Sequence, residues 1–183
     1  KCAMKATGIV RRIDDLGRIV IPKEIRRTLR IREGDPLEIF TDREGKVILK
    51  KYSPIGELGT LAGIYADSLS KTLGCTVCIT DTDQVIAAAG NGKKELQEML
   101  LSAELAEVFQ ERKTVLKKSS DAEFVAITKD RSEYSEEIIS VILSEGDIAG
   151  GVIFLQKNEK KHFGEMEKKF AAGAADLLGR QLS

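Results

Sequence analysis

Signals for turns and for a helix start follow one another so closely in the first fifty residues that no strand there can be long. Leu16-Gly17-Arg18 predicts a turn, Pro22 sets φ for a first helical turn, and Gly34-Asp35-Pro36 ends the helix. Asp42-Arg43-Glu44-Gly45 predicts a hairpin loop. The expected elements are two strands, a helix and two further strands, at residues 7–14, 18–21, 23–29, 37–41 and 46–51.

So short a segment with so many strand edges cannot easily bury them within one copy of itself. We therefore expect a dimer in which two chains share strands and close the sheet.

The charges of the chain divide at the end of this segment. Residues 1–52 contain 14 Lys and Arg against 8 Asp and Glu, a net charge of +6, whereas residues 53–183 contain 15 against 21, a net charge of −6. The formal net charge of zero conceals this division. Opposite charges predict a basic module that binds a polyanion and an acidic module with another task.

Hydropathy and cysteine usage exclude several classes of protein. No run of 18 apolar residues occurs, which argues against a membrane-spanning helix and a secretory signal. Three Cys and three Pro do not make a disulfide scaffold or a Pro-rich protein. An odd number of Cys in a well-charged chain favours the reducing cytoplasm.

The predicted helix of the basic module presents a continuous cationic stripe. Lys23, Arg26, Arg27 and Arg30 follow the spacing i, i+3, i+4, i+7, and Arg11, Arg12 and Arg18 add charge beside it. Guanidinium groups suit phosphate oxygens and guanine edges. A solvated charged face is the alternative, but eight Arg within 52 residues favour nucleic acid. With only Phe40 and Tyr52 aromatic here, stacking on single strands is poorly supported, so duplex DNA is expected.

Residues 7–14, 16–22 and 24–29 resemble the AbrB-type swapped-hairpin DNA-binding domain, and the similarity continues through Gly34-Asp35, 37–39 and 47–52. The pattern D-x-x-G-R-I-V-I-P from Asp14 to Pro22 is highly specific. The resemblance implies an intertwined dimeric β-barrel. It also implies DNA contacts from Arg11, Arg18, Arg26 and Arg27, with Arg12 at a position that the family fills with Lys or Arg. We place this domain at residues 4–53, because Lys1-Cys2-Ala3 ahead of Met4 looks foreign to it.

Two helices are expected to begin and end the remaining domain, residues 54–183. Ser53 can cap the first of them at Pro54. Both helices repeat apolar residues at 3-4 spacing, at Ile55, Leu58, Ala62, Tyr65 and Leu69 and at Phe163, Met166, Phe170, Gly173 and Leu177. Such seams predict a four-helix bundle that pairs two dimers into a homotetramer. The alternative is that both helices cover the sheet of their own domain.

Between these helices the pattern predicts an antiparallel sheet and one long helix. The strands are expected at 75–81, 85–89, 123–128, 138–144 and 148–156, the helix at 93–112, and a turn at Glu145-Gly146-Asp147. This α+β arrangement resembles a GAF domain in size, strand order and terminal helices. The resemblance implies that the domain serves regulation and could bind a small-molecule effector, which the sequence does not identify; no cofactor is predicted.

The side chains of the second domain that could take part in catalysis or metal binding do not form a recognisable site. Cys75 and Cys78 lack further ligands and are expected to be buried on opposite faces of a strand. Gly90-Asn91-Gly92-Lys93-Lys94 departs from the phosphate-loop pattern and is expected to be a turn before a helix. His162, the single imidazole, is expected to be a solvated helix-end residue. Three acidic residues lack a defined partner, namely Asp121, Glu123 and Asp130.

These observations favour a non-enzymatic, cytoplasmic, nucleoid-associated regulator that binds double-stranded DNA. In this interpretation the chain dimerises through residues 4–53 and tetramerises through residues 54–183. An antitoxin that sequesters a toxin is the main alternative, although its tail would be short and poorly ordered. An enzyme of small molecules is a third, disfavoured by the missing catalytic constellation.

Overall fold

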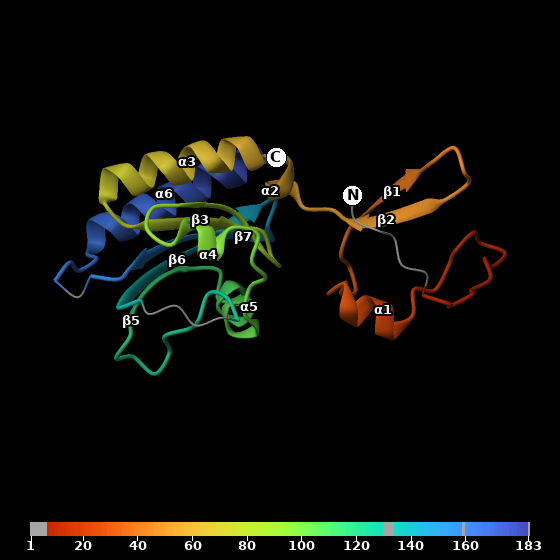
Figure 1. Cartoon of the computed structure of the whole chain (residues 1–183), viewed down its shortest axis with the longest axis horizontal. Helices are drawn as coiled ribbons and strands as arrows, with labels where there is room; N and C mark the ends of the chain where they lie inside the picture. Colours follow the sequence, from red (N-terminus) through yellow and green to blue (C-terminus); the bar gives the residue numbers. More distant parts are fainter. Residues whose placement is uncertain (1–6, 130–133, 159, 183) are drawn as a thin grey trace. The chain divides into compact units, whose positions relative to one another are not determined.

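The chain divides into two compact units, Lys1–Tyr52 and Ser53–Ser183. The computed structural model describes residues 7–129, 134–158 and 160–182 (Figure 1). Met4, where the first domain is expected to begin, and Asp130 lie outside the described residues.

The first unit contains one short helix and one hairpin. Helix α1 spans Lys23–Thr28, and strands β1 (Leu37–Thr41) and β2 (Val47–Lys51) pair antiparallel. The loop between the strands is held by Asp42, whose Oδ1 accepts hydrogen bonds from the backbone N–H of Glu44 and of Lys46, both at 2.9 Å. Gly45 has a φ of +80°, as a left-handed turn position requires. The predicted helix and the predicted hairpin are confirmed.

The two strands predicted before α1 are not formed, and the described residues contain no closed barrel. Residues 7–14 and 18–21 are irregular, and their side chains are exposed up to the half-buried Ile21, with Val10 85% and Val20 73% accessible. The physical reason is that a strand exists only where a second strand accepts and donates its backbone hydrogen bonds. Within the described part of one chain, no segment supplies that partner.

The second unit is a five-stranded antiparallel sheet with helices on both faces (Figure 1). The strand order is β4-β3-β7-β6-β5. The strands are β3 (Thr76–Thr80), β4 (Val85–Ala89), β5 (Thr114–Lys118), β6 (Glu136–Ser144) and β7 (Asp147–Gln156). Helices α2 (Pro54–Glu57), α3 (Gly59–Leu73) and α6 (Glu165–Gln181) cover one face, and α4 (Lys93–Leu96) and α5 (Ala103–Gln110) cover the other.

Alternate residues of the central strands supply the two hydrophobic cores. Ile138 and Ile142 of β6 pack under α3 and α6, whereas Ile139 and Val141 pack on the side of α5. Cys75 and Cys78 are buried on opposite faces, as expected. The α+β architecture, with helices flanking an antiparallel sheet, matches the prediction for this part of the chain.

Two predicted elements of this unit are wrong. The long helix at 93–112 is two short helices, because Glu98 adopts a φ of +64° and Ser102 begins a new helix by accepting the Leu105 N–H at 3.0 Å. Residues 123–128 do not form a strand of the sheet. The edge strand is β5 instead, which pairs with β6 and was not predicted.

The helix start at Ser53 and the turn between β6 and β7 follow the prediction. Ser53 Oγ accepts the Gly56 N–H at 3.0 Å and so caps α2, with Pro54 in the first position of the helix. Glu145 (φ +51°) and Gly146 (φ +89°) form the two-residue turn between β6 and β7.

The two predicted helix seams have different environments. Ile55 and Ala62 are fully buried and Tyr65 packs against the same core, so the first seam is used within its own domain. The second seam is largely exposed: Met166, Phe170 and Leu177 are 61%, 42% and 40% accessible. Phe163, the first residue of this seam, is buried, whereas Ile64 on α3 is also exposed, at 59%.

Candidate nucleic-acid interface

A turn organised by Asp14 presents Arg18 at the surface. Asp14 Oδ1 accepts the backbone N–H groups of Leu16 (3.0 Å) and Arg18 (2.8 Å), and its Oδ2 lies 2.8 Å from Arg18 Nε. The backbone N–H of Arg18 has the largest effect on the pKa of Asp14, and together with the Arg18 guanidinium and the Leu16 N–H it outweighs desolvation, so the pKa is lowered. Gly17, at a φ of +74°, permits the chain reversal. The carboxylate thus fixes the backbone from which Arg18 projects.

Helix α1 holds three of the predicted cations, but not the fourth. Lys23, Arg26 and Arg27 lie on the helix, and Lys23 and Arg27 are exposed while Arg26 is half-buried. Arg30 lies beyond the end of α1 with a φ of +54°, so it is not part of a helical stripe. The prediction of a continuous stripe to Arg30 is wrong because the chain turns back there, where the Ile31 N–H donates to Arg26 O at 2.8 Å.

Most of the predicted DNA-binding cations have no acidic partner. Within residues 7–129, 134–158 and 160–182, neither Arg12 nor any cation of α1 forms an ion pair with Asp or Glu. Arg11, also exposed, bonds only to the neighbouring Val10 carbonyl at 3.4 Å. Surface guanidinium groups that are not neutralised locally are free to bind the phosphates of a polyanion.

The same unit has almost no hydrophobic interior in one chain. Pro22 alone is buried among residues 7–52, and Ile13, Leu16 and Ile39 are about two-thirds exposed. Exposed apolar surface on this scale marks an interface with another protein chain. The cations therefore lie on a unit whose apolar side chains one chain alone leaves uncovered.

The second unit places His162 against a buried carboxylate. Glu136, at the start of β6, is 2% exposed, and its Oε1 lies 2.7 Å from His162 Nδ1 while its Oε2 accepts the Phe163 N–H at 2.6 Å. These bonds and the charges of His162 and Lys118 outweigh the largest single effect, desolvation, so the pKa of Glu136 is lowered. The predicted solvated His162 is exposed but has a partner, and the pair ties the start of α6 to the sheet.

Other predicted features of this unit have structural roles. Burial raises the pKa of Cys75 to about 11 and that of Cys78 to about 12, so both thiols are unreactive. No group of three or more His, Cys, Asp or Glu that could hold a metal occurs among the residues described. Residues 90–92 form the predicted turn before α4, and Asp121 Oδ2 accepts the Lys118 N–H at 2.8 Å.

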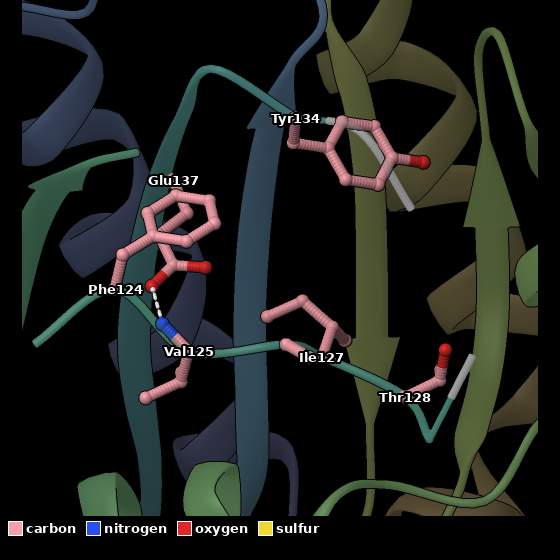
Figure 2. A pocket seen from close by; sticks show the side chains of 7 residues that line it. Phe124, Val125, Ile127, Thr128, Tyr134 and Glu137 are labelled. Carbon is pink, nitrogen blue, oxygen red and sulfur yellow. Dashed lines mark hydrogen bonds between the residues drawn. The ribbon is translucent and has the colours of Figure 1, made fainter. Parts of the chain in front are cut away.

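Sequence reasoning missed Glu137, which lines a cavity on the α5 side of the sheet (Figure 2). Its side chain is fully buried, and Oε1 accepts the Val125 N–H at 3.0 Å. Burial raises the pKa of Glu137 to about 7, with smaller opposite effects from the Val125 N–H and the charge of Lys117. The signal in the sequence was the pair Glu136-Glu137 directly before the apolar run of β6. Neighbouring residues of a strand lie on opposite faces, and both of these acidic side chains are buried.

The chain matches two described families. Residues 57–183 match the stage V sporulation protein T C-terminal family, a transcription factor family, and residues 10–57 match the family of the bacterial antitoxin MazE. Stage V sporulation protein T of Bacillus subtilis (strain 168) is 51% identical over 98% of this chain and 99% of its own length. The transition state regulatory protein AbrB of the same organism is 44% identical over 51% of this chain and 98% of its own length.

Solved structures agree on the fold of the second unit. The second GAF domain of DevS from Mycobacterium smegmatis superposes with a TM-score of 0.54 at 12% identity, covering 71% of this chain and 93% of that one. The type II free methionine-R-sulfoxide reductase of Thermoplasma acidophilum gives a TM-score of 0.55 at 12% identity, over 70% and 94%. At such low identities the similarity concerns the fold alone, which is GAF-like.

Proposed function

The chain belongs to the stage V sporulation protein T family, and from this we propose that it is a sporulation-type transcription regulator that binds duplex DNA. Residues 4–53 form the DNA-binding and dimerisation domain, and residues 54–183 form a GAF-like domain for oligomerisation and the sensing of a small molecule. The observation that carries the proposal is the group of α1 cations and Arg12 without acidic partners.

The cations have two tasks in this proposal. Arg11, Arg18, Arg26 and Arg27 make the main contacts, and these are chiefly to phosphates, so sequence selectivity is modest. Arg12, Lys23 and Arg30 add positive charge beside them. Arg18 is the best positioned, because the Asp14 turn holds its backbone before DNA arrives.

Two copies of the first domain complete each other in the proposed dimer. Residues 7–14 and 18–21 lack strand partners in one chain, and Val10 and Val20 expose most of their apolar surface. Pairing these segments with those of a second chain supplies the missing backbone partners and covers the side chains.

We expect the substitution Val20→Asp to break this dimer, because it introduces a charge into the covered apolar surface. Analytical ultracentrifugation of the full chain should show the tetramer reduced to a dimer held by the second domain, with loss of DNA binding. The matched control is Arg43→Asp in the exposed β1–β2 loop, which should leave the assembly intact. A Val20→Asp protein that remains tetrameric would contradict the proposed dimer.

The proposed tetramer uses the exposed seam of α6. Met166, Phe170 and Leu177 lie along one side of the helix, and a Cβ added at Gly173 between them would meet no described atom outside the helix backbone within 4 Å, so a second helix can approach closely there. Tetramerisation places two DNA-binding dimers in one particle.

Phe170→Asp is expected to reduce the tetramer to a dimer and to leave the second domain folded, since Phe170 is 42% exposed and lies outside the core. Sedimentation velocity measures the change, and circular dichroism confirms folding. Asp176→Asn, on an exposed position of the same helix, serves as control. If the oligomeric state of Phe170→Asp does not change, the α6 interface is wrong.

An antitoxin is the second candidate, favoured by the MazE match over residues 10–57. The second unit weakens it, because a five-stranded sheet with two hydrophobic cores is not the short, poorly ordered tail of such proteins. Co-purification of a stoichiometric toxin partner would favour the antitoxin.

The relatives are transcription regulators, and we propose no enzymatic activity for this chain. The reductase similarity concerns the fold alone. In the described part of the chain no helix is both long and apolar enough to cross a bilayer. We place the protein in the cytoplasm, associated with the nucleoid, because its proposed partner is DNA.

A further inference from the structure

The two units are joined with no residue between them. The last residue of the first unit, Tyr52, donates its backbone N–H to Pro36 O at 3.0 Å, and the second unit begins at Ser53. Ser53 is held inside the second unit, because its Oγ accepts the Gly56 N–H at 3.0 Å at the start of α2. The bonds about which the chain can bend between the units are therefore those of Tyr52 and Ser53.

The hydroxyl of Ser53 makes a second bond that helix capping does not require. Its Oγ donates to Asp81 Oδ2 at 2.9 Å, although the two residues are 28 positions apart in the sequence. Asp81 follows directly after β3, and only 7% of it is exposed. A serine that caps a helix needs only to accept a backbone N–H, so the bond to this carboxylate has to be explained separately.

Asp81 is a fixed anchor for that bond. Its other oxygen, Oδ1, accepts the backbone N–H groups of Asp83 and Gln84, both at 2.7 Å, in the turn that leads to β4. On β7, a Cβ added at Gly150 would lie 2.9 Å from Asp81 Cα, so that strand packs closely against this residue. The Ser53 hydroxyl is thus bonded to a buried carboxylate that the sheet holds in place.

We propose that Ser53 and Asp81 are positioning residues for DNA binding: their hydrogen bond fixes the residue from which the first unit extends, and so prepares the two dimers of the tetramer to hold one duplex together. This role rests on the proposed function. Two linked binding modules hold one target more tightly when their connection matches the spacing of the two sites. A junction that is ordered before binding also avoids the conformational entropy that a loose one loses on the DNA. The bond to a carboxylate is charge-assisted, which makes it a stronger restraint than a bond between neutral groups.

Helix capping alone is the competing explanation, and one pair of substitutions separates the two. Asp and Asn cap helices about as well as Ser. Ser53→Asn also keeps an N–H that can donate to Asp81, whereas Ser53→Asp has no donor and places a second negative charge beside it. Ser53→Asn is therefore the matched control for Ser53→Asp.

Fluorescence anisotropy measures the affinity of the full chain for two duplexes, a short one that accommodates one dimer and a long one that accommodates both dimers of the tetramer. The ratio of the two affinities removes most of the effect of the added charge. Ser53→Asp should reduce the advantage of the long duplex by about fivefold or more, since only simultaneous binding depends on the junction. Ser53→Asn should keep the ratio of the parent. An unchanged ratio in folded Ser53→Asp would overturn the positioning role.

Folding and the junction itself are followed without DNA. Urea unfolding should show that Ser53→Asp keeps nearly the stability of the parent, because the helix cap remains. If it does not fold, Ser53→Ala takes its place, because this variant removes the donor without adding a charge. Amide nitrogen relaxation should give lower order parameters at positions 52 and 53 in Ser53→Asp than in Ser53→Asn.

Equal order parameters in the two variants would mean that the bond to Asp81 does not order the junction, and would also overturn the proposal. A parent chain that binds neither duplex contradicts the proposed regulator function instead. In that case the relaxation measurement still decides whether the bond between Ser53 and Asp81 orders the junction, so the two failures are distinguishable.

Discussion

Raising the salt concentration from 50 to 200 mM is expected to weaken DNA binding by about 10³–10⁵-fold, provided that one DNA-binding dimer makes roughly 6–10 phosphate contacts. The two-fold copies of Arg11, Arg18, Arg26 and Arg27 supply about that number. The dependence arises because each phosphate that the protein neutralises releases condensed counterions into solution. Fluorescence anisotropy with a labelled duplex over a salt series measures it.

Arg27→Ala should reduce affinity at 50 mM salt and make the salt dependence less steep, because each copy loses one phosphate contact. The side chain is exposed and has no acidic partner among the described residues, so the stability of the fold should change little. Lys94→Ala removes the same unit charge from α4 of the other domain and should leave affinity unchanged. A flat salt response, or an Arg27→Ala protein that binds like the parent, would exclude a phosphate-dominated interface.

The elements that could be predicted are those whose signals are local. Pro22 immediately precedes α1, Gly45 supplies a left-handed turn in the β1–β2 hairpin, and Glu145-Gly146 does the same between β6 and β7. Each of these depends on the φ preference of one or two residues and not on tertiary contacts. The exposed cations were also predictable, because Arg and Lys stay at the surface unless they are paired.

The elements that could not be predicted depend on partners distant in the sequence. Residues 7–14 have strand composition, but a strand needs a neighbour that one described chain does not supply. Residues 97–102 have helical composition, but Gln97 bonds across to the backbone of Ala88 and Ile86, and Leu101 pairs with Thr128. Those contacts with other segments of the same chain outweigh a helix propensity of a few tenths of a kcal/mol per residue.

Burial of Glu137 was unpredictable for the same reason. Acidic residues are rarely buried without a partner, so composition places this side chain in solvent. Its position is decided by the pairing of β6 between β5 and β7, which leaves both faces of the strand covered. Burial of this carboxyl should make the stability of the domain depend on pH.

Glu137 should make the protein less stable as the pH rises from about 5 to about 8. The pKa of its carboxyl is about 7 in the folded chain, against 4.5 for a glutamate in water, chiefly because burial disfavours the charged form. Between these values the folded state holds a proton that the unfolded state has released, so the free energy of unfolding falls with rising pH. A difference of about 2.5 pH units corresponds to a loss on the order of 3 kcal/mol once the pH is above 7.

Glu137→Gln isolates this contribution, because its amide does not titrate while Lys117, which faces it on β5, and the Val125 N–H remain in place. Urea unfolding at pH 5.5 and pH 8.0, at one protein concentration and ionic strength, should show that the parent loses about 2 kcal/mol more between the two pH values than the variant. Glu123→Gln should follow the parent, since the side chain of Glu123 is exposed and lies outside the core. Identical pH dependence in the parent and in Glu137→Gln would mean that the buried carboxyl is not held neutral by the fold.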